Sequence, residues 1–226
     1  MQRFIALIWM FKLSTICFSQ DSLSINFRVK FQGEELQLGK EYHWNGHPIK
    51  FTNVKFYIGS MALKMGDSVI FADKKAHLVD YSNVQPLMIQ LPMLYEFDRI
   101  ELVIGTDSLV NVSGEFTADL DPINGMYWTW QSGFINLKLE GNSSLCSTRK
   151  NEFVYHIGGY EKPFETHHIF EFPIVNSPKM DVEVKLDDLI FNMMQSGRFH
   201  LMSPGQDAHD FSILFKKAFS VTNGKD

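Results

Sequence analysis

The stretch Leu23-Ser-Ile-Asn-Phe-Arg-Val-Lys-Phe31 places an apolar side chain at every second position, with polar residues between them. Side chains of a β-strand alternate between the two faces of a sheet, so this period of two predicts a strand with one buried face. Five apolar residues in strict alternation are enough to set the register of such a strand. The chain therefore opens on a half-buried sheet.

Similar short runs follow along the chain. Strands are predicted at Ile49–Leu63, Ser68–Phe71, Ala76–Asp80, Leu87–Leu91, Arg99–Ile104, Phe134–Leu139, Glu152–Ile157, Thr166–Val175 and Met180–Leu186. The segment from Thr106 to Gly125 is expected to be irregular. Helices are predicted at Asp187–Gln195, which begins with capping aspartates, and at Phe211–Phe219, where apolar residues recur every three or four positions. This order predicts an all-β fold: an antiparallel β-sandwich of about ten short strands with one or two short C-terminal helices.

The composition agrees with one sandwich domain. The 226 residues include twenty phenylalanines, whose rings suit the thin core between two sheets. No internal repeat and no low-complexity linker interrupts the chain. We therefore expect residues 20–226 to form a single domain.

Residues 1–19 have a different character. Arg3 precedes the apolar run Phe4–Phe11, and Cys17-Phe-Ser19 supplies small residues for a signal peptidase. Lys12 interrupts the segment, and the uncharged run is far shorter than the roughly 20 residues that a membrane-spanning helix needs. The segment is interpreted as a signal peptide cleaved near Ser19, and the protein as periplasmic or secreted, without a membrane span.

Charge and cysteine content narrow the function further. Loss of Arg3 and Lys12 with the leader changes the formal charge from −5 to −7, which disfavours binding to nucleic acid or to anionic membrane surfaces. Cys17 leaves with the leader, so Cys146 stays alone and no internal disulfide can form.

The most distinctive segment carries two of the four tryptophans. Its sequence is Leu120-Asp-Pro-Ile-Asn-Gly-Met-Tyr-Trp-Thr-Trp-Gln-Ser-Gly-Phe-Ile135, followed by Lys138-Leu-Glu-Gly141. On an extended backbone Trp128 and Trp130 project from one face with Met126 beside them. Composition alone favours a patch of aromatic core at this position.

This segment resembles the W-x-W motif of the MbnP-like copper-binding family. Four further pieces agree, in the order that the family has them: Phe51–Ile58, His77–Asp80, Ile104–Gly114 and Tyr155-His-Ile-Gly-Gly159. The resemblance covers most of residues 22 to 220. It implies an exported protein that binds copper, in which a tryptophan of the motif, here Trp128 or Trp130, is oxidised to kynurenine by a MauG-like di-heme peroxidase acting as partner. Related copper proteins hold the metal with histidines and a kynurenine.

The sequence offers eight histidines as ligands, and imidazole nitrogen and thioether sulfur both suit copper. His156 is the first candidate, because it lies in a predicted strand within the family-like motif, and His77 is the second on the same argument. His200 lies near Met202 in a C-terminal loop, and His47 lies in a turn close to His43. For each of these histidines, a backbone-bonded or solvated side chain remains the alternative.

No nucleophile–base pair and no phosphate-binding loop occurs in a suitable setting, so an enzyme is not expected. Two functions remain open. One is an exported copper-binding protein. The other is a metal-free β-sandwich that acts as an interaction or scaffold module at the cell surface or in the periplasm, with the tryptophans as core.

Overall fold

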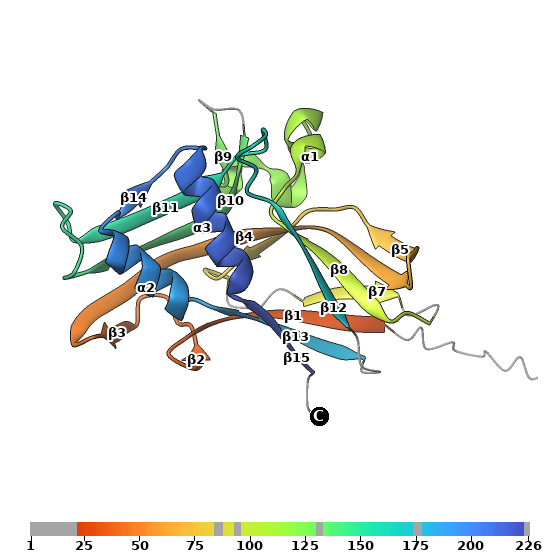
Figure 1. Ribbon diagram of the computed structural model, residues 1–226, viewed down its shortest axis with the longest axis horizontal. Coiled ribbons are helices and arrows are strands. Elements are labelled where there is room, and N and C mark those ends of the chain that lie inside the picture. The colour runs from red at the N-terminus through yellow and green to blue at the C-terminus, as the bar shows by residue number, and fades with distance from the viewer. Residues whose placement is uncertain (1–21, 84–87, 93–95, 130–132, 174–177, 224–226) are drawn as a thin grey trace, which may run out of the picture.

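The computed structural model describes residues 22–83, 88–92, 96–129, 133–173 and 178–223, and two sheets pack face to face in it (Figure 1). The smaller sheet has the order β15-β13-β1-β2, and β7 also pairs with β1. Its strands are β1 (Ser22–Phe31), β2 (Glu34–Glu35), β7 (Met88–Pro92), β13 (Lys179–Lys185) and β15 (Phe219–Asn223).

The larger sheet is organised around one long strand, β4 (His47–Met65). Its order is β12-β8-β4-β10-β11-β14, and β3, β5 and β6 also pair with β4, while β9 pairs with β10. The bounds are β3 (Glu41–Trp44), β5 (Ser68–Asp73), β6 (His77–Asp80), β8 (Arg99–Ile104), β9 (Tyr127–Trp128), β10 (Gly133–Ser143), β11 (Glu152–Gly158), β12 (His168–Pro173) and β14 (His200–Leu201).

The main core lies between the two sheets. The predicted alternation of β1 is confirmed, since Leu23, Ile25, Phe27, Val29 and Phe31 are all fully buried. Phenylalanine rings from both sheets meet edge to face: Phe31 lies 5.0 Å from Phe51 between ring centres. Such edge-to-face contacts stabilise the core beyond the effect of the buried area alone. Their preferred geometry helps to fix how the two sheets pack on each other.

Two helices complete this core at the end of the chain (Figure 1). They are α2 (Asp187–Ser196) and α3 (Gln206–Lys217). The prediction of a helix from Asp187 is confirmed. The second predicted helix begins earlier and ends earlier than expected, and Phe219 starts β15 instead. No helix in the described part of the chain is long and apolar enough to cross a membrane.

The sandwich prediction is confirmed, with two corrections. Strand orientation is mixed and not purely antiparallel, because β1 pairs with β13 and β11 pairs with β14 in parallel. Parallel partners cannot be joined by a hairpin, and both pairs are indeed joined by long crossovers. The segment from 106 to 125, expected to be irregular, contains α1 (Ser108–Ser113) and the 3₁₀ turns η1 (Ala118–Leu120) and η2 (Pro122–Asn124).

Candidate metal centre

A second, smaller cluster of buried side chains covers the opposite, outer face of the larger sheet. It contains Tyr57, Leu120, Met126, Trp128, Phe134 and Ile135. Tyr57 alternates along β4 with Phe56 and Ile58, which belong to the main core. Neighbouring strand residues point to opposite faces, so the cluster around Trp128 is separated from the main core by the sheet itself.

The segment that closes this cluster is held by polar contacts. The Tyr57 hydroxyl donates to the carbonyl oxygen of Asp119 at 2.8 Å, and the Asp119 carboxylate accepts from the Leu78 backbone N–H at 2.9 Å. Asp121 caps the next turn by accepting from the Ile123 N–H at 2.9 Å. Burial raises the pKa of Tyr57 above its usual range, so the phenol stays protonated as a donor. These bonds place Met126 and Trp128 over the sheet.

The Trp128 indole lies directly on Gly158 of β11. A Cβ atom at Gly158 would stand 2.9 Å from Cζ3 and 3.2 Å from Cη2 of the indole. Only a residue without a side chain leaves room for the ring here. The contact leaves Trp128 only 5% exposed. This position was predicted to be either core or a modification target, and the burial is compatible with both.

His156 lies on the same face of β11 as Gly158, two residues earlier. Its Nε2 is 2.6 Å from Oε1 of Glu140 on β10, and the residue is 9% exposed. Asn53 Nδ2 donates to the other carboxylate oxygen of Glu140 at 3.3 Å. The hydrogen bond from His156 is the main reason why the pKa of Glu140 lies below its usual range, so the carboxyl group is ionised at neutral pH.

The tautomer of His156 follows from this pair. An ionised carboxylate can only accept, so Nε2 of His156 carries a proton, and Nδ1 is the nitrogen left for a ligand. A carboxylate that orients an imidazole in this way is the usual outer partner of a metal-ligating histidine. The chemistry of the pair therefore fits a metal such as copper. Sequence reasoning did not find Glu140, because the pairing depends on the register between β10 and β11.

Lysines border the pair on the same face of the sheet. Lys138 is in register with His156 and with Lys55, and Lys55 is in register with Asp80. The Lys55 ammonium lies 2.8 Å from the Asp80 carboxylate, and Lys138 donates to the carbonyl oxygen of Gly125. Burial lowers the pKa of Lys138 from its usual range.

His200 also belongs to this face. β14 pairs in parallel with β11, with His200 opposite Val154 and Leu201 opposite Tyr155. Residues in register share a face, so His200 points to the same side as His156, one diagonal step away. Continuing the same register would bring Met202, the residue after β14, toward His156. The side chains of His200 and Met202 are both exposed at the edge of the sheet.

The other predicted ligands lie elsewhere. His77 is in register with Ile58, on the core side of β6, and its Nε2 is 3.0 Å from the Asp73 carboxylate. The structure therefore places His77 and His156 on opposite faces of the sheet. Trp130 lies outside the described residues. Within the described ranges, no three side chains of His, Cys, Asp or Glu converge on one point.

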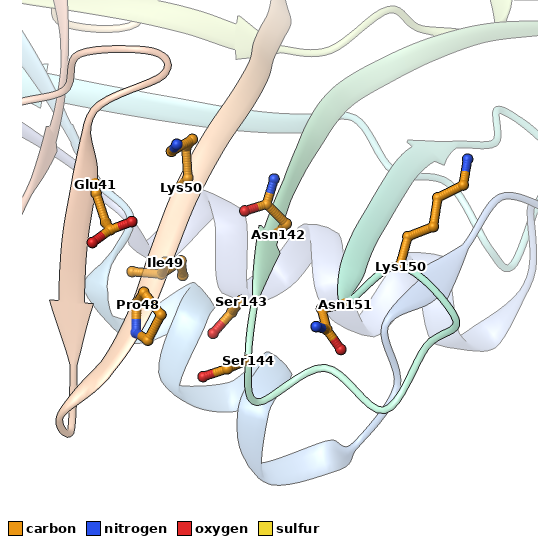
Figure 2. A pocket seen from close by; sticks show the side chains of 9 residues that line it. All are labelled: Glu41, Pro48, Ile49, Lys50, Asn142, Ser143, Ser144, Lys150 and Asn151. Carbon is orange, nitrogen blue, oxygen red and sulfur yellow. The ribbon is translucent and has the colours of Figure 1, made fainter.

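His47 stands at the far end of β4. Its Nδ1 lies 3.0 Å from the Ser144 hydroxyl. Ser144 belongs to the lining of a polar pocket of about 230 Å³, which Lys50 of β4 and Asn142 of β10 also line (Figure 2). No histidine is among the residues that line this pocket.

The sequence and the fold were compared with those of known proteins. Residues 20–202 match the sequence profile of the family described as MbnP. The chain belongs to the MbnP family. A solved structure, MbnP from Methylosinus trichosporium, superposes with a TM-score of 0.54 at 14% identity, covering 73% of this chain and 75% of that one. At that identity the likeness concerns the MbnP fold alone. No curated protein matches the chain.

Proposed function

We propose that this MbnP family member is an exported copper-binding protein and not an enzyme, with its metal on the outer face of β11 beside Trp128. One observation supports this most strongly. The indole sits on Gly158, two residues along the same strand face from the His156–Glu140 pair. A tryptophan and an imidazole oriented by a carboxylate thus lie close together on one face of the sheet.

Three groups would supply the ligands. His156 offers Nδ1, since Glu140 engages the other ring nitrogen. His200 lies in β14, which pairs with β11, and Met202 comes two residues later. Both side chains are exposed, so they can move toward a bound ion. Imidazole and thioether together favour Cu(I), a soft ion, over Ca²⁺ or Mg²⁺. Bound copper would be stored or passed on from this face.

The proposal includes oxidation of Trp128 to kynurenine by a MauG-like di-heme partner. The Trp128 indole lies over Gly158, two residues from His156 along β11, so the modified ring would lie near the metal. Exposed apolar residues on the covering segment offer a place for a partner to dock: Leu109 is 74%, Val112 68% and Ile123 87% exposed. Phe116, also partly exposed, packs 4.9 Å from Tyr127 between ring centres, so this surface is continuous with the tryptophan segment.

A Cu(I) competition titration of residues 20–226 against a chromophoric chelator tests the proposal. We expect one tightly bound ion in the wild type, at least tenfold weaker binding in His156→Ala, and no change in His77→Ala. Tandem mass spectrometry of the peptide that contains Trp128 reports whether the ring is oxidised in each preparation. Equal affinity in His156→Ala, measured on oxidised protein, would refute the site.

The same apolar surface supports a second function. Without copper binding in either form of Trp128, the protein would be an interaction module whose contact surface is Leu109, Val112 and Ile123. Replacing these three residues with Ser would then abolish partner capture and leave the unfolding temperature unchanged.

A further inference from the structure

Two histidines that no local spacing relates meet on the other side of the larger sheet. His168 begins β12, in register with the core residue Ile104, and His209 lies in the first half of α3. Their ring centres are 6.4 Å apart with 49° between the planes. α3 packs against β11 and β12 on the core side (Figure 1), so this pair is separated by the sheet from the Trp128 face.

The hydrogen bonds around the pair define which nitrogens carry protons. Ser212 donates its hydroxyl proton to the carbonyl oxygen of His209 at 2.6 Å, so it can only accept from Nε2 of His168, at 2.8 Å. Nδ1 of His209 lies 2.6 Å from the carbonyl oxygen of Glu165 and must donate to it. The lone pairs therefore remain on Nδ1 of His168 and on Nε2 of His209.

This arrangement is not a hydrolytic serine–histidine dyad. The Ser212 hydroxyl is almost fully buried and its proton is already committed to the helix backbone. Nε2 of His168 carries a proton and cannot act as its base. The pair instead consists of two imidazoles, each held by a hydrogen bond through one nitrogen. Ligating histidines in metal sites are held in the same way.

We propose that His168 and His209 form a two-histidine binding site for a soft monovalent metal ion, Cu(I) or Ag(I). With metal–nitrogen bonds of about 2.0 Å and about 1.1 Å from nitrogen to ring centre, two imidazoles on opposite sides of one ion stand roughly 6 Å apart. The observed separation of 6.4 Å between the ring centres is close to that of the linear arrangement.

The surroundings select against divalent ions. In the described part of the chain no carboxylate or thiolate joins the pair to make a group of three, whereas Zn²⁺ binds with four ligands. Burial, with help from the nearby charge of Lys216, also lowers the pKa of His168 to about 4. His168 is therefore unprotonated at neutral pH, and the same positive charge opposes Zn²⁺ more strongly than a monovalent ion.

The test uses residues 20–226 carrying His156→Ala, so that its outcome does not depend on the proposed site beside Trp128. Silver nitrate is titrated at pH 7 while the ¹⁵N NMR signals of the imidazole rings are recorded. We expect the His168 and His209 signals to shift together and to saturate at one equivalent. Adding His209→Gln should weaken binding at least tenfold, and adding His43→Gln, which alters an exposed histidine, should change nothing.

A second variant distinguishes loss of the ligand from loss of the fold. His168→Gln keeps an amide donor for Ser212, so the fold should be retained while the ligand is lost. Zn²⁺ at the same concentration should leave both signals in place. Unshifted His168 and His209 signals at saturating silver, or unchanged affinity in a folded His209→Gln protein, would overturn the proposal.

Discussion

Replacing Gly158 with alanine tests the seat of the Trp128 indole. The new methyl group would stand 2.4 Å from the Phe134 carbonyl oxygen and 2.9 Å from Cζ3 of Trp128. Both distances are well inside van der Waals contact, and the carbonyl belongs to a paired strand that cannot move freely. Overpacking of this kind costs about 1–3 kcal/mol. In a domain of this size that corresponds to a fall of roughly 2–12 °C in Tm.

The assay is thermal unfolding followed by near-UV circular dichroism, which also reports the environment of the indole. Gly133→Ala is the matched control, because a Cβ there meets Tyr160 at 3.4 Å, an ordinary contact. Its stability should change by no more than about 1 kcal/mol. A Gly158→Ala protein with the wild-type Tm and an unchanged indole spectrum would refute the reasoning about this contact.

Four further outcomes are expected. Asn136→Ala should destabilise the fold by about 3 kcal/mol in urea unfolding, because the buried amide bonds Thr106 and Thr166 on two other segments, and both would lose a partner; a loss below about 1 kcal/mol would contradict this. The pKa of His168 falls from 6.5 to about 4 on folding, so the unfolded state binds more protons between these values and stability should drop by about 1–3 kcal/mol as pH falls through that window. His168→Gln should flatten this dependence, and an equal slope in both proteins would exclude His168 as its source. Burial raises the pKa of Cys146 to about 11, so the folded mature chain should resist a thiol reagent at pH 8 and react after unfolding; rapid labelling of the native protein would count against that burial. Glu140→Gln should weaken Cu(I) binding by about 10–100-fold in the chelator competition, since the carboxylate orients the ligating ring, and unchanged affinity would separate this carboxylate from the site.

Local patterns predicted most of the sandwich. The alternation from Leu23 to Phe31 was sufficient for β1, because each apolar residue of that run faces the core. The parallel partner of β1 was not predictable, since β13 follows some 150 residues later and no turn between them fixes the pairing. Its position depends on how the two sheets pack as a whole.

The C-terminal error has a local cause. Phe215 and Phe219 are four residues apart, a spacing typical of one helix face, and their rings do meet at 5.0 Å between centres. The helix nevertheless ends at Lys217, and Phe219 pairs with Val184 as the first residue of β15. A period of four residues cannot distinguish a helical contact from a contact across a sharp turn.

The candidate site was predictable only in part. His156 and Trp128 were found from the family resemblance, and the structure places the Trp128 indole over Gly158, two residues from His156 along β11. Glu140 was missed because its contact with His156 follows from strand register. His168 and His209 were missed for the same kind of reason, since 41 positions separate them and only the packing of α3 brings them together.

The most direct measurement is X-ray diffraction at the copper absorption edge from crystals of the mature chain loaded with Cu(I). The proposed function predicts an anomalous peak on the outer face of β11, within bonding distance of His156 Nδ1 and beside Trp128. Fully loaded crystals without a peak at His156, whether the copper lies at His77 or elsewhere, would contradict it.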